Sequence, residues 1–67
     1  MCLSSVYSES EGKCSLVMAK VANVEVLPNG ILCRDFLGRT LSVDGHISKI
    51  DLENNAIICK KEIKKRG

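Results

Sequence analysis

Tight-turn signals divide this chain into short segments and limit it to a fold of short strands. Pro28-Asn29-Gly30 and Asp44-Gly45 are typical of hairpin turns, because asparagine, aspartate and glycine tolerate the positive φ that such turns need. The segments between turns are rich in valine, isoleucine and leucine, and no stretch shows the 3.6-residue repeat of an amphipathic helix. The sequence therefore predicts β-strands joined by turns.

Seven short runs are predicted to be strands, at a spacing of roughly eight residues. They cover residues 2–8, 14–19, 22–26, 31–35, 40–43, 47–52 and 56–60. The apolar members of these alternating runs should share one interior. That core is predicted to contain Val6, Leu16, Val24, Val26, Leu41, Val43, Ile50 and Ile57. The expected fold class is all-β, a small barrel or sandwich of about six to seven short antiparallel strands.

Length and charge predict one domain with a basic end. A chain of 67 residues buries only about 60% of its unfolded surface and usually needs a disulfide, a metal or a second subunit. Residues 60–67, KKEIKKRG, hold five of the ten Lys and Arg and one acid, whereas the remainder holds five bases and seven acids. We predict a small β domain over residues 1–60 and a basic C-terminal tail over 61–67. A small core and unused strand edges also predict a homodimer.

The cysteines and the N-terminus indicate a reduced, cytoplasmic protein. The chain begins Met1-Cys2-Leu3 without a basic region or apolar run typical of a signal peptide, and no apolar run approaches the roughly 20 residues of a membrane span. The cysteines form no Cys-x-x-Cys pair, so a zinc knuckle is not predicted. Cys14, Cys33 and Cys59 lie among β-branched residues or leucine and are expected to be core or edge residues.

Cys2 is the candidate metal ligand. Its thiolate, a nearby backbone amide and the terminal amine can close small chelate rings, and such a set of nitrogen and sulfur donors suits Ni(II) or Cu(II). The thiol (pKa about 8.5) and the amine (about 7.7–8.0) are close enough to neutrality for a metal to displace their protons. The alternative is that Cys2 is an apolar residue that begins a strand.

Four blocks in this order resemble the CooT family of small β-rich proteins. The resemblance covers about residues 1–59 and rests on Met1-Cys2-Leu-x-x-Val6-Tyr7, Met18-Ala-Lys-Val21-Ala-x-Val24-x-Val26, Phe36-Leu-Gly38, and Gly45-x-Ile47-x-x-Ile50-Asp51-Leu52 with Ile57. It implies a cytoplasmic accessory protein that binds Ni(II) through Cys2 and delivers it to carbon monoxide dehydrogenase. It also implies a homodimer in which the two N-termini lie close together with Ni(II) bound there. The three further cysteines and the basic tail depart from the family pattern.

Other functions are less well supported by the sequence. RNA binding would use a small barrel and the basic tail, but stacking needs aromatic residues and only Tyr7 and Phe36 are present, so nucleic acid is not the expected partner. HypC-type hydrogenase maturation chaperones also begin Met-Cys-Leu, but here the match stops after three residues. An enzyme is not predicted, because no Ser-His-Asp set, paired carboxylates or phosphate loop is present. His46 is expected to face solvent beside a turn.

Overall fold

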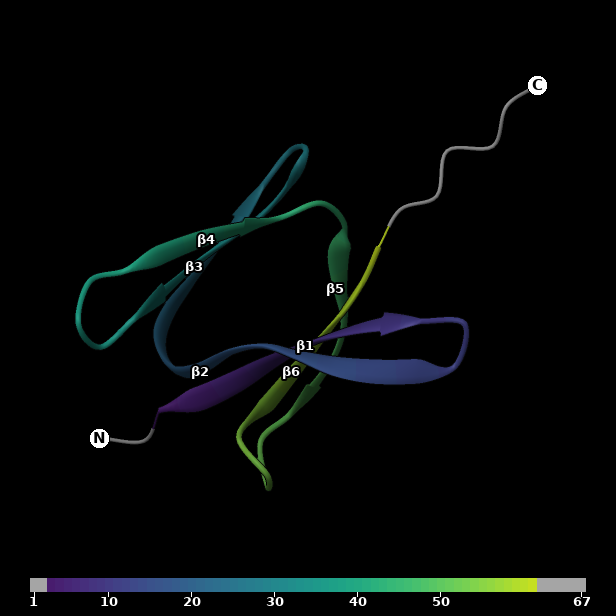
Figure 1. The fold of residues 1–67 in the computed structure, drawn as a ribbon, viewed down its shortest axis with the longest axis horizontal. Coiled ribbons are helices and arrows are strands. Elements are labelled where there is room, and N and C mark those ends of the chain that lie inside the picture. Colours follow the sequence, from purple (N-terminus) through teal and green to yellow (C-terminus); the bar gives the residue numbers. More distant parts are fainter. Residues whose placement is uncertain (1–2, 62–67) are drawn as a thin grey trace.

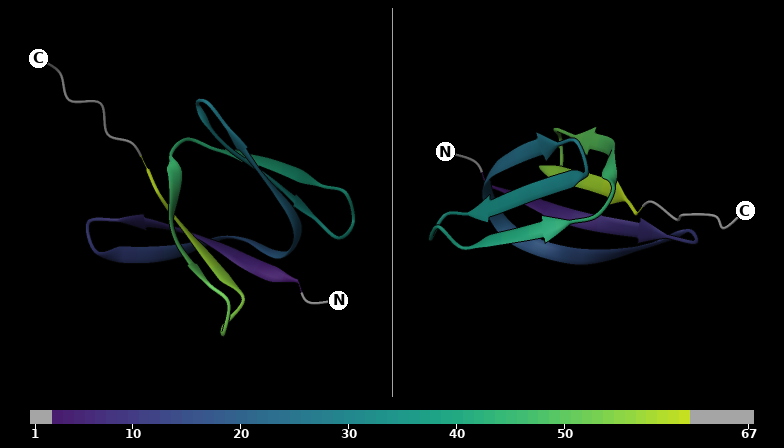
Figure 2. Two further views of the ribbon diagram at one scale, coloured as in Figure 1. Left: turned by 180° about the vertical axis from the view of Figure 1, so that it is seen from behind. Right: turned by 90° about the horizontal axis from the view of Figure 1, so that it is seen from above.

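The computed structural model describes residues 3–61, which form six strands and no helix (Figure 1). The strands are β1 (Ser4–Ser10), β2 (Lys13–Leu27), β3 (Gly30–Asp35), β4 (Thr40–Val43), β5 (His46–Asp51) and β6 (Ala56–Lys60). They form one sheet in the order β4-β3-β2-β1-β6-β5. The sheet curls round so that β3 approaches β5, but the edge strands β4 and β5 do not pair (Figure 2). The predicted all-β class is confirmed, as a curled sheet rather than a closed barrel.

The pairing contains one exception to the predicted antiparallel arrangement. Strands β1 and β6 run parallel, with Val6 opposite Ile57, whereas the other four neighbouring pairs are antiparallel. A parallel pair needs a long connection, and here β2 to β5 supply it. From β1 the chain passes through β2 and β3 to the edge strand β4. It then crosses to the opposite edge strand β5 and returns as β6, which lies beside β1 and runs in the same direction.

Strand β2 joins two strands that the sequence predicts as separate, over 14–19 and 22–26. It runs unbroken through Lys20, which adopts a positive φ of 54°. A register irregularity between Val21 and Asn23 follows this residue. The strand therefore bends sharply at Lys20, so its first half pairs with β1 and its second half with β3. The predicted break at residues 20–21 therefore falls at this bend, but the strand continues through it.

The two glycine-containing turns differ from their predicted mechanisms. The β2–β3 hairpin is present, but its two-residue loop is Pro28-Asn29, and Gly30 already pairs with Leu27. Gly30 has no positive φ; it is required because a Cβ there would collide with the carbonyl oxygen of Val43. Asp44-Gly45 does not form a hairpin at all, because it connects β4 and β5, which are the two opposite edges of the sheet. It is a corner that carries the chain across the molecule.

The core lies in the concave face of the curled sheet. The buried members are Val6, Val21, Ile31, Cys33 and Cys59, with Val17, Met18, Val24, Val43, Ile47 and Ile57 packed against them. Of the predicted core, Val6 is therefore confirmed, and Val24, Val43 and Ile57 are partly buried. The prediction is wrong for the exposed side chains of Leu16, Val26, Leu41 and Ile50.

Most of these residues are exposed because the sheet does not close, so its edges and strand ends remain uncovered. Val26 pairs with buried Ile31, and Leu41 pairs with buried Cys33, so both lie on the predicted face. They remain exposed because they lie near the end of β2 and on the edge strand β4. Leu16 differs, because it pairs with Tyr7, one residue after buried Val6, and therefore lies on the outer face.

Candidate functional site

The predicted metal residue, Cys2, lies outside the described residues, which begin at half-buried Leu3. Strand β1 starts at Ser4, and Ser4 pairs with Val21, which itself pairs with Asp35. On its other side, the backbone N–H of Ser5 donates a 2.9 Å hydrogen bond to the carbonyl oxygen of Asn55. The start of β1 is therefore flanked by the turn after β3 and the turn after β5.

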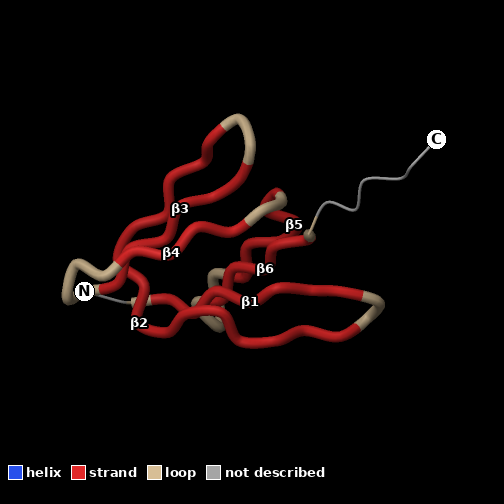
Figure 3. The backbone as a smooth tube through the Cα atoms, turned by 45° about the horizontal axis from the view of Figure 1, so that its top comes forward, coloured by secondary structure: helices blue, strands red, loops and turns tan. Residues whose placement is uncertain are grey.

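These two turns, together with Leu3 and Ser4, are called the N-terminal end below. The Asp35 turn comprises residues 35–39 and joins β3 to β4, whereas the Asp51 turn comprises residues 51–55 and joins β5 to β6. Figure 3 shows the loop between β3 and β4 beside the start of the chain, and Figure 1 shows the start of β1 on the same side of the molecule as both loops. The described part of the chain therefore begins between two turns.

The Asp35 turn is held by a buried carboxylate. One oxygen of Asp35 accepts hydrogen bonds from the backbone N–H groups of Leu37 and Arg39, both at 2.9 Å. Its other oxygen accepts a 2.8 Å hydrogen bond from Nε of Arg39. Burial opposes ionisation, but these hydrogen bonds, led by those from Arg39, outweigh it and hold the pKa of Asp35 below its usual value. The turn is therefore locked in place at neutral pH.

The same turn holds two large apolar side chains in solvent. Phe36 and Leu37 are 52% and 64% exposed, although they follow a buried residue directly. The Phe36 N–H donates a 3.1 Å hydrogen bond to the carbonyl oxygen of Lys20, at the bend of β2. The Lys20 ammonium lies 5.7 Å from the centre of the Phe36 ring, a cation–π contact. The turn therefore presents two exposed apolar side chains, with the Lys20 ammonium beside the Phe36 ring.

The Asp51 turn repeats this construction. One oxygen of Asp51 accepts hydrogen bonds from the backbone N–H groups of Glu53 (3.1 Å) and Asn54 (3.2 Å), and the other accepts one from the Asn54 amide (2.9 Å). Hydrogen bonds from the Asn54 side chain and backbone lower the pKa of Asp51 despite partial desolvation. Leu52, at the tip, is 81% exposed.

The sequence analysis did not predict that Asp35 and Asp51 hold their turns through hydrogen bonds. Asp51 is half-buried and Glu53 is exposed, and nothing in the sequence analysis anticipates the hydrogen bonds that Asp51 accepts. The signal was present in each case: an aspartate ends a strand and is followed within four residues by glycine or asparagine. Aspartate side chains at that position commonly accept hydrogen bonds from the backbone two residues ahead.

The described cysteines do not contribute to the N-terminal end. Cys33 and Cys59 are fully buried, and burial raises the pKa of each thiol; the neighbouring Cys33 raises that of Cys59 further. Both therefore stay protonated near neutral pH. Cys14 is exposed but pairs with Glu9, at the opposite end of β1 from Ser4. Within residues 3–61, no three histidine, cysteine, aspartate or glutamate side chains are grouped as a metal site.

Thiol reactivity should separate these cysteines. In a Cys2→Ser protein, Cys14 should react with an aromatic disulfide reagent in the folded state. Cys33 and Cys59 should react roughly 150–5,000 times more slowly, because the domain must first open and a chain of this size has about 3–5 kcal/mol of stability. Absorbance of the released thiolate, with and without denaturant, measures both phases. A Cys14→Ser variant is the control, since it should lose only the fast phase; two fast thiols would contradict the structure.

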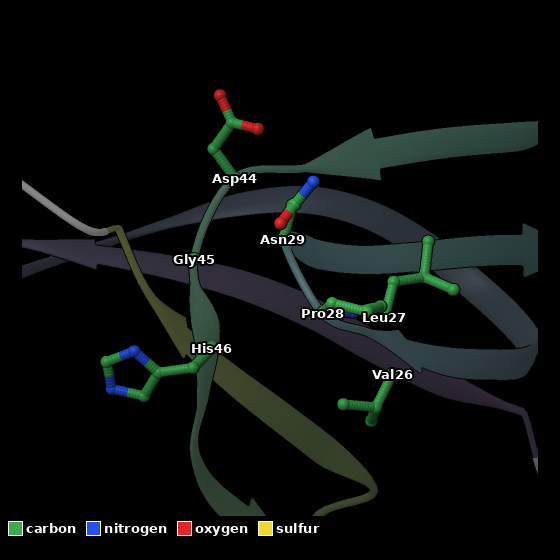
Figure 4. A pocket seen from close by; sticks show the side chains of 7 residues that line it. All are labelled: Val26, Leu27, Pro28, Asn29, Asp44, Gly45 and His46. Carbon is green, nitrogen blue, oxygen red and sulfur yellow. The ribbon is translucent and has the colours of Figure 1, made fainter.

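A surface hollow of about 710 Å³ lies where the β2–β3 hairpin meets the β4–β5 corner. It is lined by Val26, Leu27, Pro28, Asn29, Asp44, Gly45 and His46. Figure 4 shows the side chains of Asp44 and His46 pointing in different directions. These two side chains therefore do not converge on a common point in the hollow. The exposed position of His46 agrees with its prediction.

None of the described segments is a helix long and apolar enough to cross a bilayer. The fold and the N-terminal end together define a class of small all-β protein in which the first strand begins between two turns that hydrogen bonds hold in place. The family model of the CO dehydrogenase accessory protein CooT matches residues 1–60. The chain therefore belongs to the CooT family, which confirms the resemblance recognised from its sequence blocks.

A relative and a solved structure agree with this assignment. An uncharacterized protein of Methanothermobacter thermautotrophicus is 36% identical over 62 residues, which cover 92% of each chain. The crystal structure of a candidate CooT from Carboxydothermus hydrogenoformans superposes with a TM-score of 0.83 at 19% identity. The match covers 92% of this chain and 100% of the other chain. At that identity the structural match supports the fold.

Proposed function

We propose that this chain is a nickel-binding accessory protein that carries Ni(II) to carbon monoxide dehydrogenase. The observation that carries the proposal is its membership of the CO dehydrogenase accessory family over residues 1–60. Carbon monoxide dehydrogenase is a nickel enzyme, so an accessory protein that offers a thiol ligand would suit the delivery of its metal. The protein acts as a carrier and not as a catalyst in this proposal.

Cys2 is the proposed metal ligand. Elimination supports it: the thiols of Cys33 and Cys59 are buried, and Cys14 lies at the far end of β1. A thiolate with one or two backbone nitrogens favours Ni(II) and Cu(II) over Mg²⁺ or Mn²⁺. A carrier must also release its metal, and a small set of donors at a chain terminus releases a metal more readily than a closed four-ligand site.

The proposed assembly is a cytoplasmic homodimer. Two termini that met at a two-fold axis would supply two thiolates and two nitrogens, a planar four-donor set of the kind Ni(II) accepts. The core is small, with five buried apolar or cysteine side chains among the described residues, so a second subunit could add to the stability of the fold.

The decisive experiment compares Cys2→Ser with Cys14→Ser in nickel titrations of the reduced, untagged protein. A thiolate-to-nickel charge-transfer band should appear in the near ultraviolet for the parent and for Cys14→Ser. Cys2→Ser should lose the band and at least about 10–100-fold in affinity, the loss that even an outer-shell partner causes. Affinity should also fall as pH falls, because protons compete with the metal for the thiolate.

Native mass spectrometry of the same samples gives the number of nickel ions and subunits together. Equal nickel affinity in Cys2→Ser and the parent would refute the assignment of Cys2, and nickel-free parent protein under saturating metal would refute nickel carriage altogether.

A further inference from the structure

The outer edge of β4 borders a groove that ends at Lys61. On one side β4 pairs with β3, but none of the described residues pairs with its other side. Beside that edge lies a hollow of about 400 Å³, whose walls include Leu41 and Val43 of β4, Ser8 of β1 and Val17 of β2. Lys61, the last described residue, also lines this hollow. The described part of the chain therefore ends at the groove.

The pairing of β5 with β6 sets the direction in which the chain reaches this groove. The two strands are antiparallel, and His46, the first residue of β5, lies opposite Lys60, the last residue of β6. The next pair in the same register is Gly45 with Lys61. The Cα of Lys61 would lie 3.1 Å from a Cβ placed on Gly45, so the two backbones are still side by side there. The chain after β6 thus follows its partner up to the corner between β4 and β5 (Figure 1).

We propose that residues 62–66 continue β6 past this corner as a strand that pairs with the free edge of β4 and fills the groove. The same register, continued, places Ile63 opposite Val43 and Lys65 opposite Leu41. The sheet would then close, because the extended β6 would pair with β5 along one half and with β4 along the other. Strand β2 already has this form, since it pairs with β1 along its first half and with β3 along its second. Closure would also cover the backbone groups that make a free edge prone to pair with other chains.

Two separate observations place the apolar side chain of this segment in the groove. The first is the register: Val43 pairs with buried Ile31 and packs against the core, so a residue opposite Val43 faces the core as well. The second is alternation along the strand, since Ile63 follows fully buried Cys59 by four positions and therefore has the same face. Ile63 is the one large apolar residue of 62–67.

The charges on the outer face also suit this pairing. Exposed Asp44 would lie opposite Glu62, with Lys60 and Lys64 at the two diagonal positions. Diagonal neighbours on antiparallel strands lie within reach of long side chains, so the two ammonium groups can contact both carboxylates. The outer face is therefore neutral at the corner, and no charge has to enter the core there.

Paired cysteines test the register directly. In a metal-free protein with Cys2→Ser and Cys14→Ser, Ser42→Cys is combined either with Lys64→Cys, its expected partner, or with Lys65→Cys, which should face the other way. Oxidised glutathione accepts the two electrons and is released as two thiols, and mass spectrometry measures the equilibrium. The disulfide between positions 42 and 64 should form with an equilibrium constant at least about 10-fold larger, because directly opposed Cβ atoms lie within reach of a disulfide. Equal constants for the two pairs would overturn the proposal, since a segment that is not paired brings both thiols to position 42 equally.

Moving the isoleucine tests whether its burial stabilises the domain. Glu62→Ile combined with Ile63→Glu exchanges two neighbours, so composition and charge stay the same but the apolar side chain moves to the outer face. This variant and Ile63→Ala should each raise the unfolding equilibrium constant by about 10-fold, because an isoleucine side chain is no longer buried. Arg66→Ala, at the exposed end of the segment, should change it by less than about 2-fold. Urea unfolding followed by circular dichroism measures all four proteins, and an exchange variant as stable as the parent would refute burial of Ile63.

Deleting residues 62–67 distinguishes this occupant of the groove from any other. In amide hydrogen exchange followed by NMR, the N–H groups of β4 that point to its free edge should exchange at least about 10-fold faster in the shortened protein than in the parent. Those bonded to β3 should change less, because their partners remain. Equal exchange at the free edge in the two proteins would overturn the inference, as would protection that depends on protein concentration, which would indicate a second copy at this edge. Neither measurement involves nickel, so failure of the proposed metal site would leave the inference standing.

Discussion

Replacing Gly45 with alanine should largely unfold the domain. Gly45 has a φ of 148°, a conformation that L-residues with a side chain rarely adopt, and a Cβ there would collide with the carbonyl oxygen of Lys60. Adding about 1–3 kcal/mol for the backbone conformation and about 1–3 for the displaced backbone predicts a loss of about 2–6 kcal/mol. That is as large as the roughly 3–5 kcal/mol that stabilises a domain of this size.

The location of Gly45 makes this clash hard to relieve. It lies in the corner between β4 and β5, the two edges of the sheet, and touches the end of β6. If the corner moved outward, β5 and β6 would move away from β3 and uncover the core. Gly12→Ala is the matched control, because Gly12 also has a positive φ (80°) but open space around its Cα. It should cost only about 1–2 kcal/mol.

Urea unfolding followed by circular dichroism, under reducing conditions, compares the two glycine variants with the parent. The midpoint should fall for Gly12→Ala but remain measurable, whereas Gly45→Ala should show no folded baseline. Similar midpoints for the two variants would contradict the close approach of the corner to Lys60.

The sequence predicts strand positions and side-chain faces better than burial. Alternation placed Val24, Val26, Leu41 and Val43 on one face, and the structure agrees, because they pair with buried Cys33 or Ile31. Alternation cannot reveal whether a sheet closes. Closure depends on whether β4 and β5 pair, which is decided by contacts between residues far apart in the chain. Val26 and Leu41 are therefore exposed although their face is correct.

The turn residues likewise predicted where the chain turns, but not why a glycine is required at each turn. Gly30 and Gly45 both follow turn-forming residues, and both are needed for space rather than for a hairpin conformation. The contacts that require them, with Val43 and Lys60, come from other strands. A single-sequence argument can locate such glycines, but the neighbouring backbone appears only when the chain is folded.

The candidate site was predicted only in part. Cys2 was singled out by its position in the sequence and by the family resemblance, and it remains a prediction because it lies outside the described residues. Its surroundings could not be anticipated: Asp35 and Asp51 are separated by sixteen positions in sequence, yet their turns flank the start of β1. Only the order of strands in the sheet brings them together.

Replacing Ile31 with alanine should destabilise the domain strongly, whereas Val26→Ala should not. These residues pair across β2 and β3 and lie on the same face, but Ile31 is fully buried and Val26 is 70% exposed. Truncating a buried isoleucine removes contacts and leaves a cavity, at a cost of about 2–5 kcal/mol. An exposed valine away from such contacts should contribute within about 0.5 kcal/mol.

Urea unfolding of the two variants tests whether the end of β2 is exposed to solvent. The midpoint should fall steeply for Ile31→Ala and stay near that of the parent for Val26→Ala, with a common slope for all three proteins. The comparison is sharp because both changes shorten a β-branched side chain at paired positions, so strand propensity changes in the same direction in each. Equal losses would mean that the end of β2 is covered in solution, and the open end of the sheet described here would then be wrong.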